Sequence, residues 1–346
     1  MRPVAGAAPL EAVSPPEPIR PASPKARRRR EALEGYLFLC PALVIIGLFY
    51  VYPALYSFYV SLFRWEVVQE AFVGLRNYAH LLHDPDFGHS MLLSIVYVAG
   101  SVPIEIAIGL ALALLLHQGL RARAFFRLLY FLPYITSQVA LSLVWGWIFN
   151  AQYGVANAVL RLVHLPPQGW LLANNGASSV WQVASGGHLH APDAAPPSLA
   201  LASIMLVTVW FYVGFHTVVY LSGLSAIPTE VTEAARIDGA AGFSLFRYIT
   251  FPLLTPTTYF LLIIATIGAM TSFNIVYILG GGGVQAGCGG NPLETTKVAA
   301  LFIFDRFWCQ TELGYASAAA FVLSLVILAL TVLNVRAVGR RVAFAD

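Results

Sequence analysis

Six long stretches of the chain are apolar and nearly free of charge, and they limit the possible folds more than any other feature. Each exceeds the roughly 20 residues that a helix needs to cross about 30 Å of hydrocarbon. Only 11% of the 346 residues are charged and 58% are hydrophobic, too few charges to cover a soluble domain. The alternating polarity of barrel strands is not seen. The sequence therefore predicts an all-α, polytopic membrane protein with six transmembrane helices, over residues 36–63, 91–116, 128–150, 199–224, 257–279 and 313–335.

The lysines and arginines are shared unevenly between the two sides that these helices define. With the amino terminus inside, the inner segments carry 15 of the 20 Lys and Arg residues and the outer segments carry 5. Positive residues concentrate on the cytoplasmic side of membrane proteins. The bias predicts a multi-pass protein of the cell membrane with both termini cytoplasmic, and with inner segments at 1–35, 118–127, 225–256 and 336–346.

The amino-terminal segment differs in character from the rest of the chain. Residues 1–35 are rich in Pro and Ala, and the basic run KARRRR occupies residues 25–30. Such a segment has too little apolar surface to fold, so a disordered cytoplasmic tail is expected ahead of a transmembrane domain over 36–346. Four arginines just before a spanning helix suit anionic lipid better than nucleic acid, so membrane lipid is an expected partner and nucleic acid is not.

The cysteines, glycines and histidines of the outer segments do not form a recognisable chemical site. Cys288 and Cys309 lie in one outer segment, where a disulfide and two free thiols are both open. The glycines at 280–283 lack the Lys-Ser or Lys-Thr of a phosphate-binding loop. His188 and His190 alone are weak evidence for a metal site. No metal and no catalytic residue is expected, and the chain is not expected to be an enzyme.

The inner segment at 225–256 has the features of a structured hairpin between two spans. Pro228 suits the first turn of a helix, and Glu233 places negative charge near the positive end of that helix. Gly239 suits the left-handed position that ends a helix. A second short helix over 243–249 is expected to follow, before two prolines redirect the chain into the next span.

One face of the first short helix is suited to contact with another protein. Val231, Ala234, Ala235 and Asp238 recur at the three- and four-residue spacing of a single helical face, and the alanines permit close approach. A stiff hairpin of this kind can transmit force. An ordinary interfacial hairpin, which any multispan protein can possess, is the alternative.

This hairpin resembles the EAA loop of ABC importer permeases. The resemblance consists of Glu-Ala-Ala, an Asp-Gly, a later Ile and a Pro at the spacing of that family, between the expected fourth and fifth spans. Phe251 stands where the family usually has Leu before the Pro. In the family the loop docks into a cleft of the ATPase, so the resemblance implies this coupling role for Glu233, Ala234, Ala235, Asp238, Gly239, Ile249 and Pro252.

The likeness extends from about residue 36 to the end of the chain, and it is to carbohydrate-type permeases related to the larger membrane subunit of maltose transporters. It implies half of a heterodimeric channel, whose partners are a second permease, two ATPase subunits and an extracytoplasmic sugar-binding protein. The chain itself would hold no cofactor, because the ATPase subunits bind ATP and Mg²⁺. Besides the hairpin, the blocks that carry the likeness are 73–78 with Asp84-Pro85, 121–127, 131–133, 145–150 with Tyr153-Gly154, and 224–228.

The fourth and fifth spans combine aromatic and hydrogen-bonding residues, which is what a hydroxyl-rich ligand requires. The resemblance implies a central cavity lined by the spans that flank the EAA loop. Ordinary packing or an interfacial belt explains any one aromatic residue equally well, and an interhelical hydrogen bond would serve Asn274. The candidates for the substrate path are Phe211, Tyr212, Phe215, Thr271, Ser272 and Asn274.

Glu105 is the only acidic residue inside an expected span, which makes it a functional candidate. A proton-coupled carrier needs such a carboxylate, so a self-sufficient ion- or proton-coupled secondary transporter is the alternative function. That class is expected to show charged pairs across several spans and an inverted repeat, and neither is seen. Glu105 could equally bond to a neighbouring helix or be protonated. Because a glutamate at this position also resembles a common choice in these permeases, such a structural role is favoured for it. The favoured function is a permease subunit of an ATP-driven importer of di- or oligosaccharides, with the choice of sugar left open.

Overall fold

The computed structural model describes residues 24–118, 122–171, 197–281 and 294–338. The chain divides into two units, Met1–Tyr56 and Ser57–Asp346. Three expectations fall outside the described residues. These are the disorder of residues 1–23, most of the loop at 178–197 with its two histidines, and the pairing of Cys288 with Cys309.

The first unit consists of a helical segment that starts before the expected boundary at residue 36. α1 (Pro24–Ile46) begins early because Pro24 suits a first helical turn and the Ala, Arg, Glu and Leu residues that follow favour helix. A π-turn, Gly47–Val51, then leads into α2 (Tyr52–Ser61). The wide turn coincides with Pro53, which has no N–H to donate. The apolar side chains of α1 are exposed along its length, as expected for a helix that lipid or another subunit covers.

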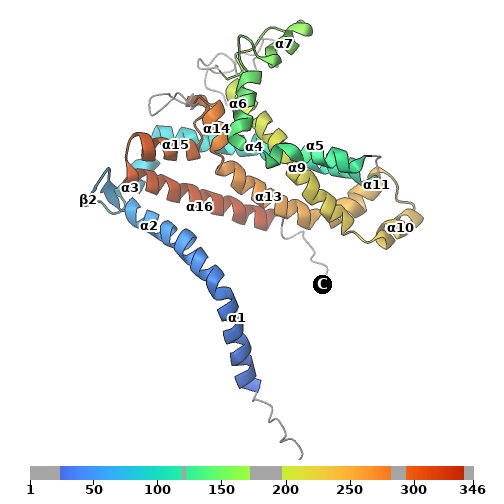
Figure 1. The fold of residues 1–346 in the computed structure, drawn as a ribbon, viewed down its shortest axis with the longest axis horizontal. Helices are drawn as coiled ribbons and strands as arrows, with labels where there is room; N and C mark the ends of the chain where they lie inside the picture. The colour runs from blue at the N-terminus through green and yellow to red at the C-terminus, as the bar shows by residue number, and fades with distance from the viewer. Residues whose placement is uncertain (1–23, 119–121, 172–196, 282–293, 339–346) are drawn as a thin grey trace, which may run out of the picture. The chain divides into compact units, whose positions relative to one another are not determined.

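Four helices form the main bundle of the second unit (Figure 1). They are α4 (Pro85–His117), α9 (Leu199–Ser225), α13 (Thr255–Met270) and α16 (Leu313–Val338). α4, α9 and α16 are each long and apolar enough to cross a membrane as single helices. α5 (Arg123–Ile135) packs along α9, so that α9 lies in the middle of the bundle with half or more of its length buried.

Glycines allow α4 and α9 to approach closely. A Cβ atom on Gly109 would lie 2.7 Å from the Cβ of His216, and one on Gly100 would lie 2.7 Å from the sulfur of Met205. Small residues permit such contacts between membrane helices. These contacts fix how α4 and α9 are aligned along each other, and the alignment determines which of their side chains face each other.

The expected third and fifth spans are broken, so the prediction of single helices over 128–150 and 257–279 is wrong in detail. α5 is followed by α6 (Gln138–Ile148) at an angle of 98°. A helical stretch at Phe243–Leu253 meets α13 at 65°, and α14 (Asn274–Leu279) follows α13 after a further break. The count of six spans agrees with the structure if each bent pair is one span.

Local hydrogen bonds explain why the break after α5 is tolerated in an apolar region. The N–H and the hydroxyl of Thr136 both donate to the carbonyl oxygen of Pro133, at 3.2 and 2.7 Å. The backbone of Thr136 and Ser137 is extended, which ends α5 and turns the chain. Backbone groups without partners are costly in hydrocarbon, and these bonds satisfy the broken end.

The two ends of the second unit carry different structures (Figure 1). α10 (Thr229–Ile237) and α11 (Phe243–Leu245) lie at one end, and α3 (Arg76–Leu82) and α15 (Ala299–Phe304) lie at the other. The α3 end includes an antiparallel hairpin of β1 (Phe63–Trp65) and β2 (Gln69–Phe72), which the sequence did not predict. The remaining described elements are α7 (Val155–Leu162), α12 (Phe251–Leu253), the π-turns η2 (Phe246–Thr250) and η4 (Asp305–Cys309), and the 3₁₀ turn η3 (Glu294–Thr296).

Polar residues of the block at 73–78 fasten the α3 end to the end of α2. Asn77 Nδ2 donates to the carbonyl oxygens of Ser61 and Phe63, at 2.8 and 3.0 Å. The hydroxyls of Tyr78 and Ser61 are hydrogen-bonded at 2.7 Å. Gly74 has a φ of +56°, a conformation that glycine adopts at little cost. This block, one of those that carry the family likeness, therefore has a structural role here.

Candidate ligand cavity and coupling hairpin

A cavity of about 180 Å³ lies among α4, α5, α9 and α13 of the second unit. Its wall combines aromatic rings, hydroxyl groups, a carboxyl group, an imidazole and the small residues of α13. This mixture of apolar surface with a few polar groups is typical of sites for small ligands. The lining residues are Glu105, Tyr134, Thr208, Tyr212, Phe215, His216, Ile264, Ala265, Gly268, Ala269 and Ser272.

Tyr134 supplies an aromatic wall that the sequence analysis did not identify. Its ring stacks on that of Phe215, with centroids 4.9 Å apart, and contacts the rings of Phe211 and Tyr212 at 5.7 and 6.0 Å. Tyr134 reaches α9 because a close backbone contact between Gly214 and Tyr130 brings α5 against that helix. The aromatic residues at 130, 131 and 134 were the signal in the sequence that could have identified this wall. Only the three-dimensional packing shows that Tyr134 faces α9.

Hydroxyl groups from α4, from α9 and from the segment after α13 form a polar cluster beside the cavity. Tyr97 Oη is 2.6 Å from Thr208 Oγ1 and 3.2 Å from Ser272 Oγ. Tyr97 is fully buried, and Thr208 and Ser272 both line the cavity. These hydroxyls satisfy one another, so the cluster joins α4, α9 and the segment after α13.

A second set of hydrogen bonds connects the broken spans to α9. Gln138 Nε2 donates to Tyr212 Oη at 3.1 Å, and Asn274 Nδ2 donates to Gln138 Oε1 at 3.1 Å. Gln138 is the first residue of α6 and Asn274 the first of α14. One amide side chain therefore links the two breaks to an aromatic residue of the cavity wall.

Glu105 and His216 are buried side chains that line the cavity and have atoms without a hydrogen-bond partner. Glu105 is 2% exposed and His216 is 1% exposed. Glu105 Oε2 and His216 Nδ1 have no partner within the described part of the chain. A structural role for Glu105 was expected to involve a hydrogen bond to a neighbouring helix, and Oε2 makes no such bond within the described residues.

The six substrate-path candidates divide into two groups. Tyr212, Phe215 and Ser272 line the cavity. Phe211 is buried in the core beside them, Thr271 is exposed and bonds to its own helix, and Asn274 is exposed and bonds to Gln138. A role in the substrate path stays a prediction for all six. Tyr134, Thr208 and His216 also line the cavity, and none of them was among the candidates predicted from the sequence.

The coupling hairpin begins with α10, whose carboxyl end has the hydrogen bonds of a Schellman motif. The N–H of Ala240 donates to the carbonyl of Ala235 at 2.9 Å, and that of Gly239 donates to the carbonyl of Arg236 at 3.1 Å. Gly239 has a φ of +89°, in agreement with the expected left-handed position. This geometry makes the turn after α10 rigid.

The hairpin presents an exposed surface at its end of the bundle. Glu233, Ala234 and Asp238 are exposed, whereas Ala235 is buried. The second helical stretch begins at Phe243, and within it Ile249 is half-buried and Pro252 exposed. Large apolar side chains also point outward, with Ile237 86% exposed, Phe243 76% and Tyr248 73%. Such a concentration of exposed apolar side chains in a polar segment is typical of a protein-binding surface.

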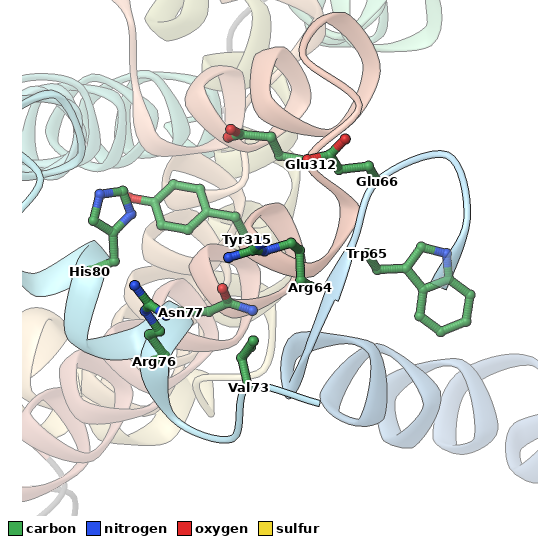
Figure 2. A pocket seen from close by; sticks show the side chains of 9 residues that line it. All are labelled: Arg64, Trp65, Glu66, Val73, Arg76, Asn77, His80, Glu312 and Tyr315. Atoms are coloured by element: carbon green, nitrogen blue, oxygen red, sulfur yellow. The ribbon is translucent and has the colours of Figure 1, made fainter. Parts of the chain in front are cut away.

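A second cavity, of about 320 Å³, lies at the α3 end of the second unit (Figure 2). Arg64 is 4.0 Å from Glu70, and Asn77 is committed to the backbone bonds described above. Figure 2 shows that residues of the β1–β2 hairpin, of α3 and of the start of α16 surround this cavity. The lining residues are Arg64, Trp65, Glu66, Val73, Arg76, Asn77, His80, Glu312 and Tyr315.

Residues 105–344 match the sequence model of a protein family, the binding-protein-dependent transport system inner membrane component. The match covers more than half of the chain, including the cavity and the coupling hairpin. The chain belongs to this family. It is the permease component of a binding-protein-dependent ABC transport system, a membrane subunit rather than an enzyme.

Curated relatives align with the permease over nearly its whole length. The trehalose/maltose transport system permease protein MalF of Thermococcus litoralis is 31% identical over 313 residues, covering 90% of this chain and 95% of that protein. The lactose transport system permease protein LacF of Rhizobium radiobacter is 29% identical, covering 91% and 97%. The sn-glycerol-3-phosphate transport system permease protein UgpA of Brucella abortus is 28% identical, covering 90% and 96%.

Two solved structures share the fold of the permease. A bacterial ABC transporter involved in the import of the acidic polysaccharide alginate matches with a TM-score of 0.68 and 18% identity, covering 93% of this chain and 99% of that one. The alginate transporter in complex with its pentasaccharide-bound periplasmic protein matches with a TM-score of 0.67, at the same 18% identity, covering 92% and 97%. The fold is therefore that of an ABC importer membrane subunit.

Proposed function

We propose that this permease imports a di- or oligosaccharide and forms half of the translocation pathway together with a second permease. Two ATPase subunits would bind ATP and Mg²⁺ and drive the cycle, and an extracytoplasmic sugar-binding protein would deliver the ligand. The named substrates of the relatives, trehalose, maltose and lactose, support a sugar as the ligand. This chain would contribute passage and coupling, and it would bind no cofactor itself.

The single observation that carries the proposal is the cavity among α4, α5, α9 and α13. Sugar rings have apolar faces that stack on aromatic side chains, and their hydroxyls need hydrogen-bond partners. The rings of Tyr134, Tyr212 and Phe215 and the hydroxyls of Thr208 and Ser272 offer both in one place. α9 and α13, on either side of the coupling hairpin, both line this cavity, so motion of the hairpin would act directly on its walls.

The coupling hairpin supports a separate ATPase as the source of energy. Glu233 and Ala234 are exposed beside the rigid turn at Gly239, and exposed apolar side chains flank them. A rigid, partly apolar surface can be gripped by another subunit and moved as a unit. Its place at the end of the bundle remote from α3 suits a cytoplasmic motor, with the α3 end facing the binding protein (Figure 1).

Uptake into proteoliposomes tests the proposal. The complete complex, with second permease, ATPases and binding protein, should accumulate a radiolabelled sugar from a set of trehalose, maltose and lactose only when ATP is enclosed with the ATPases. Omitting the ATPases or the binding protein should abolish uptake. Uptake by the permease alone in response to a proton gradient would instead establish the secondary-transporter alternative.

Orientation is tested separately by labelling a single cysteine placed at position 237, where the native side chain is 86% exposed. In whole cells that produce the permease without its ATPase and with its three native cysteines replaced, a membrane-impermeant maleimide should react with Ile237→Cys only after the membrane is permeabilised. The matched control is Leu82→Cys in α3, where the native leucine is 74% exposed and labelling should occur without permeabilisation. The reverse pattern would contradict a cytoplasmic hairpin and cytoplasmic termini.

A further inference from the structure

The cavity contains two buried polar side chains whose hydrogen-bonding capacity the protein does not use. Glu105 Oε2 and His216 Nδ1 have no partner within the described residues, and both side chains line the cavity. Leaving a carboxyl oxygen or an imidazole nitrogen unpaired in a membrane interior is unfavourable, so such groups are found where a ligand or partner meets them.

The packing of α4 against α9 places these two groups in the same part of the cavity. Gly109 and His216 touch, with a Cβ on Gly109 reaching within 2.7 Å of the Cβ of His216. Glu105 lies one helical turn before Gly109 on the same face of α4, and Tyr212 lies one turn before His216 on α9. The carboxyl group, the imidazole and the Tyr212 hydroxyl therefore border one region of the wall.

The neighbouring hydroxyls do not satisfy this pair. Thr208 and Ser272 share the hydroxyl of Tyr97, at 2.6 and 3.2 Å, and Tyr212 Oη accepts from Gln138 at 3.1 Å. A buried glutamate with a purely structural role is expected to bond to an adjacent helix. Here the four hydroxyls just named are bonded to one another or to Gln138, and Oε2 of Glu105 is left for a molecule in the cavity.

The chemistry of the wall also restricts the kind of ligand. A sugar hydroxyl can donate to the carboxyl oxygen of Glu105 and can donate to or accept from the ring of His216. A phosphate ester is an anion, and proteins bind such anions with Arg, Lys or the amino terminus of a helix. Among the described side chains that line this cavity, none is lysine or arginine.

We propose that Glu105 and His216 are ligand-binding residues of this permease and that they select a neutral, hydroxyl-bearing ligand over a phosphate ester. The inference rests on the proposed role of the cavity as the sugar route. This selectivity would distinguish the permease from its relative UgpA, which is named for the transport of sn-glycerol 3-phosphate and is 28% identical to this chain.

Chemical labelling of Glu105 in the complete complex tests the proposal. A hydrophobic carbodiimide converts carboxyl groups in apolar surroundings to stable N-acylureas, and peptide mass spectrometry measures the adduct at Glu105. We expect labelling in the absence of sugar and at least about threefold protection by whichever of trehalose, maltose and lactose the same complex takes up. sn-Glycerol 3-phosphate should give no protection. Absence of labelling without sugar, equal labelling with and without it, or protection by sn-glycerol 3-phosphate would each overturn the proposal.

Substitutions separate ligand binding from a structural role. Glu105→Leu and His216→Leu should each lower sugar uptake about tenfold or more, since a site that bonds ligand hydroxyls loses that bond. Glu105→Gln, whose amide still donates and accepts, should retain more activity than Glu105→Leu. In His216→Leu, the protection of Glu105 by sugar should also weaken. Ser101→Ala is the matched control, because Ser101 is buried one turn before Glu105 and its hydroxyl donates to the carbonyl of Tyr97 in its own helix, at 2.8 Å.

Failure of the proposed function and failure of the ligand-binding assignment would give different results. If no tested sugar is taken up by the wild-type complex, the proposed function is contradicted. If sugar uptake is normal in the wild type and in Glu105→Leu, and sugar does not protect the carboxyl group, then the function stands and the assignment of Glu105 and His216 is wrong. A simple folding defect would lower copurification of the ATPase with the variant, which we expect to be unchanged.

Discussion

Tyr315 donates a hydrogen bond of 2.7 Å to Oδ2 of Asp84, although the two residues are 231 positions apart in the sequence. Asp84 is at the same time the amino-terminal cap of α4, accepting from the N–H of Asp86 at 2.9 Å. Arg306 Nη2 lies 3.3 Å from the same carboxylate. One aspartate therefore starts α4 and ties it to the beginning of α16 and to η4.

Replacing Asp84 by Asn should destabilise the α3 end of the bundle. The neutral amide weakens the bond from Tyr315, the ion pair with Arg306 and the cap, for a loss of about 1–3 kcal/mol. Thermal unfolding of the purified complex in detergent measures the change. Asp86→Asn is the control, since the side chain of Asp86 is 69% exposed and lies 3.8 Å from Arg306. An equal effect of both substitutions would contradict a special role for Asp84.

The stabilisation by Asp84 should depend on pH in a defined direction. Burial acts to raise the pKa of Asp84, but hydrogen bonds from Tyr315, Asp86 and Phe87 and the charge of Arg306 outweigh it, so the pKa lies below its ordinary value. A lowered folded pKa gives stability that is complete above the unfolded value of about 3.9 and is lost as the pH falls through the folded value. The gap in unfolding temperature between wild type and Asp84→Asn should be constant from about pH 8 to 5 and shrink below about pH 4. A gap that closes near pH 6 would exclude this mechanism.

Gly214→Ala should separate α5 from α9. A Cβ at this position would overlap the backbone carbonyl of Tyr130, so α5 must move and carry Tyr134 away from the cavity wall. Overpacking of this kind costs about 1–3 kcal/mol, and sugar uptake should fall along with the unfolding temperature. In α4, no atom of the described residues lies within 4 Å of a Cβ placed on Gly88, so Gly88→Ala should leave both quantities unchanged or slightly raise stability. Normal uptake by Gly214→Ala would show that this contact does not position the wall.

Gly239→Val should uncouple the permease from its ATPase. The φ of +89° at this position is strained for a β-branched residue, at a cost of about 1–3 kcal/mol, and the Schellman turn after α10 would be lost. We expect reduced copurification of the ATPase and reduced uptake, with the transmembrane bundle still folded. Gly239→Asn is the matched variant, because Asn tolerates the left-handed conformation, and it should retain much of both activities. Equal loss in the two variants would mean that backbone geometry is not the cause.

Much of the fold could be predicted because lipid imposes simple requirements on sequence. The runs at 91–116, 199–224 and 313–335 correspond to α4, α9 and α16, since long apolar segments must be helical to satisfy their backbone groups. The break between α5 and α6 was missed because a proline such as Pro133 is tolerated within membrane helices. No local sequence pattern indicates that the backbone of Thr136 and Ser137 is extended. The early start of α1 was missed because a basic, polar composition was interpreted as a tail.

The chain's own order of residues determined that it lies in a membrane, where its long apolar helices fall, and where the rigid turn at Gly239 falls, because these depend on local composition and backbone preference. Tertiary structure alone decided that Tyr134 faces Phe215 and that Glu105 and His216 border one cavity. Those relations arise where Gly109 and Gly214 allow helices distant in sequence to touch. The periodicity of apolar residues within one helix does not indicate which other helix will pack against its glycines.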